Sequence, residues 1–206
     1  MKTILSLLAL SFFLNSNHAV GAELPTLDSP IAFSKDEDAR LQSGKAILKE
    51  VQNSPFKAYC DNAWIAVTLL KHDCQESAGL LMDFQRHPSI FPKLKDISVA
   101  PLGESRYRIT SLVKAGFFQF HFTTLWAYDS EQFLATFRLD TEEQNDFEEY
   151  RGFWKFVPQP NEKSLVLYSI RTKTVGNPLA FLEDQESRKE MVKTLEEFQK
   201  AVAAEK

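Results

Sequence analysis

The chain has 206 residues, a formal net charge of −4 at pH 7, only 7 glycines and 2 cysteines. This length suits one domain with a sizeable core, since domains commonly run about 100 to 200 residues. The acidic balance argues against binding of nucleic acid, which requires basic patches, and the few glycines form neither a phosphate-binding loop nor a G-x-S-x-G elbow.

The first residues are typical of a secretory signal peptide. Residues 1–3 carry one positive charge, residues 4–14 form an apolar run, and Val20-Gly21-Ala22 ends the segment with the small residues that signal peptidase inspects. The apolar run is shorter than the roughly 20 residues that span a bilayer, and no cysteine follows the cut as in a bacterial lipoprotein. We therefore expect residues 1–22 to be removed, and the mature chain to be soluble in the periplasm or secreted.

Residues 23–44 are predicted to be an N-terminal extension with one short helix. The first part, through Phe33, has two prolines and no apolar period, and should run extended over the surface. Ser34 and Glu37 fit a capping box at the start of a helix, and Gly44 can end that helix in a left-handed conformation.

Residues 45–206 are predicted to form the main domain. Residues 45–51 and 63–71 suggest two strands, Asp73 and Glu76 cap a helix that we expect to run through Phe84, and a short helical turn lies between two prolines, Pro88 and Pro92. Closely spaced strands follow, which indicates an antiparallel meander because parallel strands need long crossovers. These strands are expected at 96–101, 107–114, 117–128, 133–140, 150–157 and 164–173, before a last helix that Asn177 and Pro178 would start and that runs to about Val202.

The two cysteines are expected to stay unpaired. The strand at 63–71 separates Cys60 from Cys74, and at about 3.3 Å per residue it would hold the sulfurs roughly 30 Å apart. A disulfide requires the Cα atoms to lie within about 7 Å.

The predicted sheet has one unusually aromatic face. Successive side chains of a strand point to opposite faces, so Phe118, Phe120, Phe122 and Trp126 share one face while His121 lies on the other. The neighbouring strands follow the same rule, which predicts one apolar face and one largely polar face. The apolar stripe of the last helix, which includes Met191 and Leu195, must bury itself against the apolar face.

Three stretches of sequence resemble the START-like (SRPBCC) superfamily, in particular its polyketide cyclase/dehydrase and coenzyme Q-binding group. They are Leu80-Leu81-Met82-Asp83-Phe84-Gln85-Arg86-His87-Pro88-Ser89-Ile90-Phe91-Pro92, Gly152-Phe153-Trp154-Lys155-Phe156 and Val166-Leu167-Tyr168. The resemblance covers about residues 63–202. It implies an α+β helix-grip fold, in which a curved antiparallel sheet of about seven strands wraps a long C-terminal helix.

The resemblance also implies a cavity between the sheet and the last helix that binds a hydrophobic small molecule, such as a lipid, an isoprenoid quinone or a polycyclic compound. We expect binding or carriage without catalysis and without a cofactor, and a transient contact with a membrane is compatible with such a ligand. The residues expected to line the site are Tyr107, Ile109, Phe118, Phe120, Phe122, Trp126, Phe137, Trp154, Phe156, Tyr168, Met191 and Leu195.

Two alternative functions stay open. A cyclase or dehydratase would need ionisable residues that converge inside the cavity, and the predicted faces supply almost none. A protein-interaction module with a filled core would use the same aromatic residues for packing alone. Neither reading includes a metal site, because His72 and Cys74 are the only close pair of ligand types. Arg171, Lys173 and Arg188 would either hold a ligand headgroup at the mouth or serve solubility.

Overall fold

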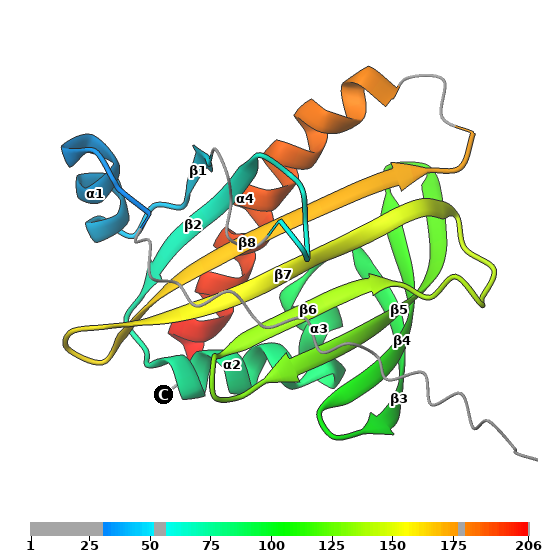
Figure 1. The fold of residues 1–206 in the computed structure, drawn as a ribbon, viewed down its shortest axis with the longest axis horizontal. Coiled ribbons are helices and arrows are strands. Elements are labelled where there is room, and N and C mark those ends of the chain that lie inside the picture. The colour runs from blue at the N-terminus through cyan, green and yellow to red at the C-terminus, as the bar shows by residue number, and fades with distance from the viewer. Residues whose placement is uncertain (1–30, 52–56, 177–179, 206) are drawn as a thin grey trace, which may run out of the picture.

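The computed structural model describes residues 31–51, 57–176 and 180–205, without the side chains of 180–185 (Figure 1). The predicted signal peptide and the predicted cap at Asn177 and Pro178 lie outside these ranges. None of the helices within them is both long and apolar enough to cross a bilayer.

The helices begin where local side chains can cap them. Ser34 and Glu37 form the predicted capping box, and Gly44 follows that helix with a φ of 77°. Asp73 accepts a hydrogen bond from the Glu76 amide at the start of the next helix. The helices are α1 (Lys35–Gln42), α2 (Cys74–Met82), the short 3-10 helix η1 (Phe84–Arg86), α3 (His87–Ile90) and α4 (Ala180–Ala204).

One expected helix ends earlier than predicted. The helix that we expected to run through Phe84 stops at Met82, because Asp83 leaves the helical region with a ψ of 74°. The chain continues as η1 and then α3, where Pro88 occupies the first turn. Proline is tolerated there because the amide that it lacks would have no partner inside the helix.

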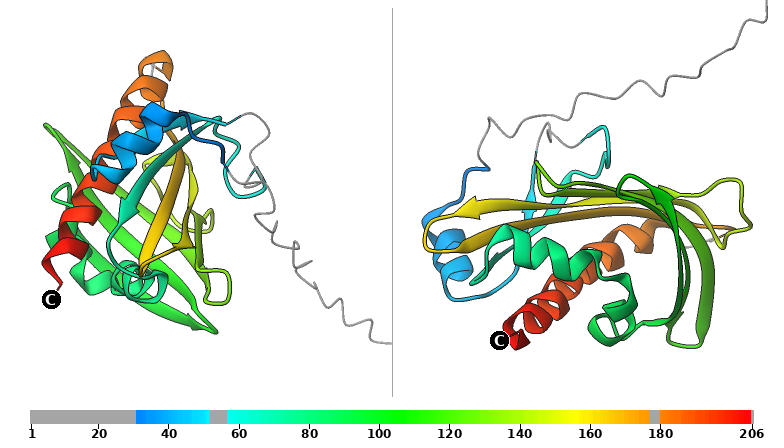
Figure 2. Two further views of the ribbon diagram at one scale, coloured as in Figure 1. Left: turned by 90° about the vertical axis from the view of Figure 1, so that its left-hand side faces the viewer. Right: turned by 90° about the horizontal axis from the view of Figure 1, so that it is seen from below.

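All the strands belong to one antiparallel sheet of eight strands, in the order β1-β2-β8-β7-β6-β5-β4-β3. Figure 2 shows that the sheet is curved, with β3 to β5 bending toward the side on which α2, α3 and α4 lie. The strands are β1 (Ile47–Glu50), β2 (Trp64–Leu70), β3 (Leu94–Gly103), β4 (Arg106–Ala115), β5 (Phe118–Asp129), β6 (Leu134–Leu139), β7 (Phe147–Gln159) and β8 (Lys163–Thr174).

The C-terminal helix covers the inner face of the sheet over β1, β2 and β8. Its apolar stripe recurs at the predicted spacing, and Met191, Leu195 and Phe198 have no accessible surface. Helix α2 packs against β7 and β8, while η1 and α3 contact β3. The antiparallel sheet and the helix that it grips confirm the predicted α+β helix-grip fold.

The outer face is not largely polar, as we expected, but apolar over one half. Leu41 of α1 packs there with Ile65 and Val67 of β2, Phe153 of β7 and Leu167 of β8, all of them buried. The expectation was wrong because it left out a partner for this face: the N-terminal segment folds back on it. The half of the outer face over β4 to β6 carries the expected arginines.

Candidate hydrophobic ligand site

The inner face carries the aromatic residues that the alternation of the strands predicted. Tyr107 of β4 pairs in register with Trp126 of β5, which pairs with Phe137 of β6, and Phe137 pairs with Gly152 of β7. Paired residues of neighbouring strands point to the same face of a sheet. This row therefore crosses four strands, with three aromatic rings and one glycine.

The residues expected to line a cavity fall into three groups by exposure. Phe118 is 71% exposed, whereas Tyr107, Phe120 and Trp126 keep part of their accessible surface. The remaining eight are buried, namely Ile109, Phe122, Phe137, Trp154, Phe156, Tyr168, Met191 and Leu195.

The buried group forms a tightly packed base beneath α4. Trp154 lies 4.3 Å from Tyr168 and 5.3 Å from Phe198 of the helix, measured between ring centroids. Phe156, also without accessible surface, lies 6.1 Å from Phe198. Edge-to-face and tilted contacts at these separations are favourable for aromatic rings. In this half of the inner face, the side chains themselves fill the space between the sheet and the helix.

The other half carries a continuous run of rings that reaches the surface. Measured between ring centroids, Phe118 lies 6.5 Å from Phe120, Phe120 lies 5.3 Å from Phe147, and Phe147 lies 5.0 Å from Phe122. Phe122 in turn lies 4.5 Å from Tyr150. An apolar path therefore leads from the β4–β5 turn to the centre of the sheet.

Gly152 makes room for the ring of Phe137. A Cβ atom at position 152 would lie 2.6 Å from Phe137 Cζ and 2.2 Å from the carbonyl oxygen of Ser169. No side chain other than hydrogen fits there. The Phe137 ring can therefore lie across β7 and stack on Trp126, with a centroid separation of 4.8 Å.

Tyr150 and Tyr168 are two of the polar residues of the inner face. Burial raises the pKa of Tyr150 to about 12, and burial raises the pKa of Tyr168 well above its usual range, with a further contribution from nearby Tyr150. Both phenols are therefore protonated at neutral pH and can donate a hydrogen bond. Tyr150 nevertheless keeps part of its accessible surface.

Tyr150 and Phe147 were missed as site residues. The signal for Tyr150 was present, because it shares the alternation of Trp154 and Phe156 along one strand. Phe147 could not be found, because the predicted strand began only at residue 150.

The short helices η1 and α3 cover part of the inner face over β4 and β5. The centroid of the Phe84 ring lies 5.0 Å from that of Tyr107 and 5.3 Å from that of Trp126. The centroid of the His87 ring lies 5.2 Å from that of Phe91. His87 is buried, its Nε2 lies 2.6 Å from the Leu81 carbonyl oxygen, and burial lowers its pKa. The ring is therefore neutral at pH 7 and packs within the fold.

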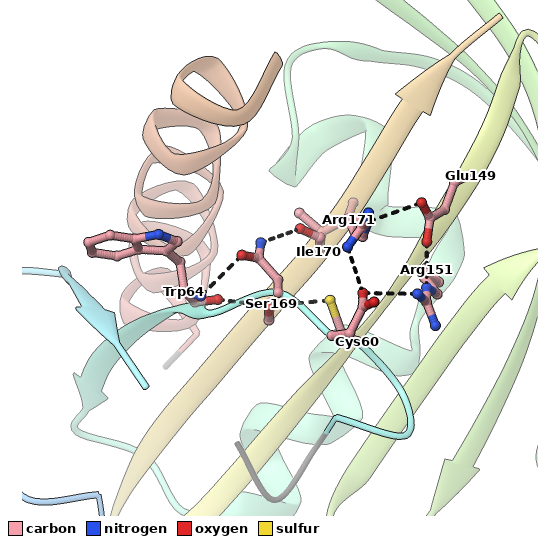
Figure 3. A network of polar contacts seen from close by, with 9 residues as sticks. Cys60, Trp64, Glu149, Arg151, Ser169, Ile170 and Arg171 are labelled. Carbon is pink, nitrogen blue, oxygen red and sulfur yellow. Dashed lines mark hydrogen bonds and ion pairs between the residues drawn. The ribbon is translucent and has the colours of Figure 1, made fainter. Parts of the chain in front are cut away.

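The cations considered for a pocket mouth do not meet there. Arg171 lies on the outer face, where Asp61 and Glu149 bind it together with Arg151 (Figure 3). Lys173 pairs with Glu148, and the Arg188 guanidinium lies 4.4 Å from the Trp64 ring centre. No group of three or more histidine, cysteine, aspartate or glutamate side chains within the described ranges could hold a metal ion.

No protein-family model and no curated protein matches the chain by sequence. Solved structures do match. The STAR-related lipid transfer protein from Xanthomonas axonopodis has a TM-score of 0.59 at 13% identity, over 68% of this chain and 85% of that one. The Zhui aromatase/cyclase from a Streptomyces species matches with a TM-score of 0.55 at 14% identity, over 77% of this chain and 93% of that one. Truncated norcoclaurine synthase from Thalictrum flavum matches with a TM-score of 0.54 at 10% identity, over 79% of this chain and 98% of that one. The chain therefore has the START-like helix-grip fold.

Proposed function

We propose that the mature chain binds or carries a hydrophobic small molecule, a lipid or an isoprenoid quinone, against the inner face of its sheet, without catalysis. The proposal includes export: residues 1–22 act as a signal peptide, and the protein meets its ligand in the periplasm or outside the cell. A protein there lies close to the lipids and quinones of the envelope.

The main support for the proposal is that helix α4 covers only part of the aromatic inner face. Helix α4 packs on β1, β2 and β8, whereas Tyr107, Phe120 and Trp126 of β4 and β5 keep accessible surface. Apolar surface left open to water is unfavourable by about 25 cal/mol per Å², so covering it contributes favourably to binding of an apolar ligand. Pockets of this type are mainly apolar, with a few polar groups that orient the ligand.

The Tyr150 hydroxyl is suited to the orienting role. The Tyr150 ring lies beside Phe122 and Phe137, and the hydroxyl stays protonated and can donate a hydrogen bond at neutral pH, since burial raises its pKa to about 12. A carbonyl or ether oxygen of the ligand would accept this hydrogen bond. A phenol that stays protonated at neutral pH is poorly suited to act as a general base.

The similar structures are compatible with this function and with its main alternative. One is described as a lipid transfer protein and one as an aromatase/cyclase. The described inner face offers tyrosine, serine and threonine hydroxyls rather than convergent carboxylates or histidines, and this composition supports the carrier.

The first test is native mass spectrometry of the protein purified from its own host. We expect a co-purified hydrophobic molecule that organic solvent removes, and a mature chain that begins at Glu23. The absence of any bound mass, together with failure to bind the probes described next, would refute the proposal.

The second test uses two uncharged probes, ubiquinone with one isoprene unit and monooleoylglycerol. Ubiquinone should quench the fluorescence of Trp126 and Trp154, and monooleoylglycerol should reverse the quenching. Phe120→Ala should weaken binding about fivefold to tenfold, since one aromatic contact is worth roughly 1 kcal/mol and 1.4 kcal/mol is tenfold. Leu112→Ala is the control, because Leu112 is also partly buried but lies on the opposite face of the neighbouring strand. Equal affinities of the two variants would place the probe elsewhere.

A further inference from the structure

The outer face of the sheet contains a hollow of about 410 Å³, on the opposite side from the inner aromatic face. Its walls come from β3 to β7 and from the segment that precedes β2. They include the apolar side chains of Leu102, Leu125 and Ala127, the ring of Tyr59, and the guanidinium-bearing side chains of Arg106 and Arg138.

A row of arginines crosses the sheet at this hollow. In register, Arg108 of β4 pairs with Leu125, Leu125 with Arg138 of β6, Arg138 with Arg151 of β7, and Arg151 with Arg171 of β8. Side chains paired in this way lie about 5 Å apart at Cβ, and like charges in directly opposite positions are destabilising. Such a row needs anions beside it.

Carboxylates neutralise both ends of the row. The Arg108 Nε lies 2.8 Å from Asp140 Oδ2 at one end. At the other end, Asp61 and Glu149 each lie within 3.0 Å of both Arg151 and Arg171, which Figure 3 shows as a closed set of ion pairs.

The middle of the row lacks a carboxylate. Within the described part of the chain, Arg138 in the middle of the row forms no ion pair. Neither does Arg106, which lies beside the row and pairs in register with Ala127, and both arginines are exposed. The hollow therefore combines two cations without a counter-ion with apolar walls.

We propose that this hollow binds an oxyanion, a phosphate or a carboxylate, that carries a short apolar group. Arg138 supplies the main contact and Arg106 a second one, because a guanidinium can bind two oxygens of one oxyanion at the same time. The apolar group lies against Leu125 and Ala127. This site is separate from the inner face and does not depend on the function proposed for that face.

The test is a titration of the isotope-labelled mature chain with monobutyl phosphate, followed by the backbone amide signals in nuclear magnetic resonance. We expect the signals of Ala127, Thr136 and Arg138 to shift. Arg138→Gln should weaken binding about tenfold, the usual effect of losing a charge-assisted hydrogen bond. Arg171→Gln is the matched control, since it changes the net charge equally at an exposed arginine that already has carboxylate partners, and it should change the affinity less than about twofold.

Two further probes separate the contributions to binding. Inorganic phosphate should bind more weakly than monobutyl phosphate, and 1-butanol should not bind. Equal binding of inorganic phosphate would overturn the proposed contact between the apolar group and Leu125 and Ala127. Equal effects of the two arginine substitutions, or shifts confined to the inner face, would overturn the proposal. Quenching by ubiquinone in Arg138→Gln tests the inner face independently, so failure of one site is distinguishable from failure of the other.

Discussion

Substitution of Gly152 by alanine tests how closely the sheet is packed behind the candidate site. The added Cβ would lie 2.2 Å from the carbonyl oxygen of Ser169, 2.6 Å from Phe137 Cζ and 3.1 Å from Ile170 Cα. Two of these three atoms belong to the backbone of β8. Contacts below 3.0 Å require movement of the neighbouring atoms, and a backbone atom in the middle of a sheet cannot move alone.

The surroundings of Gly152 resist such a movement. The Ser169 hydroxyl donates to the Trp64 carbonyl oxygen at 2.8 Å and so ties β8 to β2. Phe137 is held between Trp126 and Tyr150. Because overpacking typically costs 1–3 kcal/mol, and here two sides are rigid, we expect a loss of about 3 kcal/mol in the free energy of unfolding. For a chain of this size, that loss lowers Tm by about 6 to 12 °C.

Gly79→Ala is the control for this experiment. Gly79 lies inside α2, and a Cβ there would meet no atom within 4 Å. Alanine should therefore stabilise the helix by about 0.5 to 1 kcal/mol. Both variants are compared with the parent chain by urea and thermal unfolding, followed by circular dichroism. A Gly152→Ala variant within about 1 kcal/mol of the parent would refute the steric reasoning.

Three more predictions concern buried groups. Burial lowers the pKa of His87 below its ordinary 6.5, so the unfolded chain binds an extra proton in acid. Stability should then be full above pH 6.5 and fall below it by up to about 1.4 kcal/mol per pH unit until the pH reaches the folded-state pKa; an unchanged pH profile of urea unfolding in His87→Gln would contradict this. Burial raises the pKa of Cys60, and that of Cys74 to about 11, and both thiols are free. Ellman's reagent should therefore react slowly with the native chain and quickly in guanidinium chloride, whereas fast native reaction would be inconsistent with these environments. Phe198→Ala should cost about 3 to 5 kcal/mol because its ring packs on Trp154 and Phe156; thermal unfolding measures this, and a loss below about 1 kcal/mol would indicate a loosely packed base.

Local pattern was sufficient for much of the secondary structure and for the inner face. The capping box of Ser34 and Glu37 lies within one helical turn, so neighbouring residues alone specify it. Alternation placed Phe120, Phe122 and Trp126 on one face, because side-chain direction in a strand depends only on position along that strand. The prediction that Cys60 and Cys74 stay unpaired is confirmed for the same reason, since the extended strand between them sets their separation.

The signal peptide and the identity of the ligand stay predictions, since they concern residues and molecules outside the described structure. Within the described structure, the early end of α2 at Met82 is a point at which the prediction from local sequence was wrong. A run compatible with a helix was interrupted so that Phe84 and His87 could pack against Trp126. That contact joins residues far apart in the chain, and tertiary packing overrode local propensity.

The sequence by itself determined where the strands lie to within a few residues, which side chains share the inner face, and that a long amphipathic helix must cover it. Only the tertiary structure decided that α4 covers β1, β2 and β8 and not β4 and β5, that the N-terminal segment buries half of the outer face, and that Arg108, Arg138 and Arg171 lie in one row. The reason is physical. A strand's own periodicity is local, whereas the choice of neighbouring strands and their register depends on contacts between residues distant in sequence.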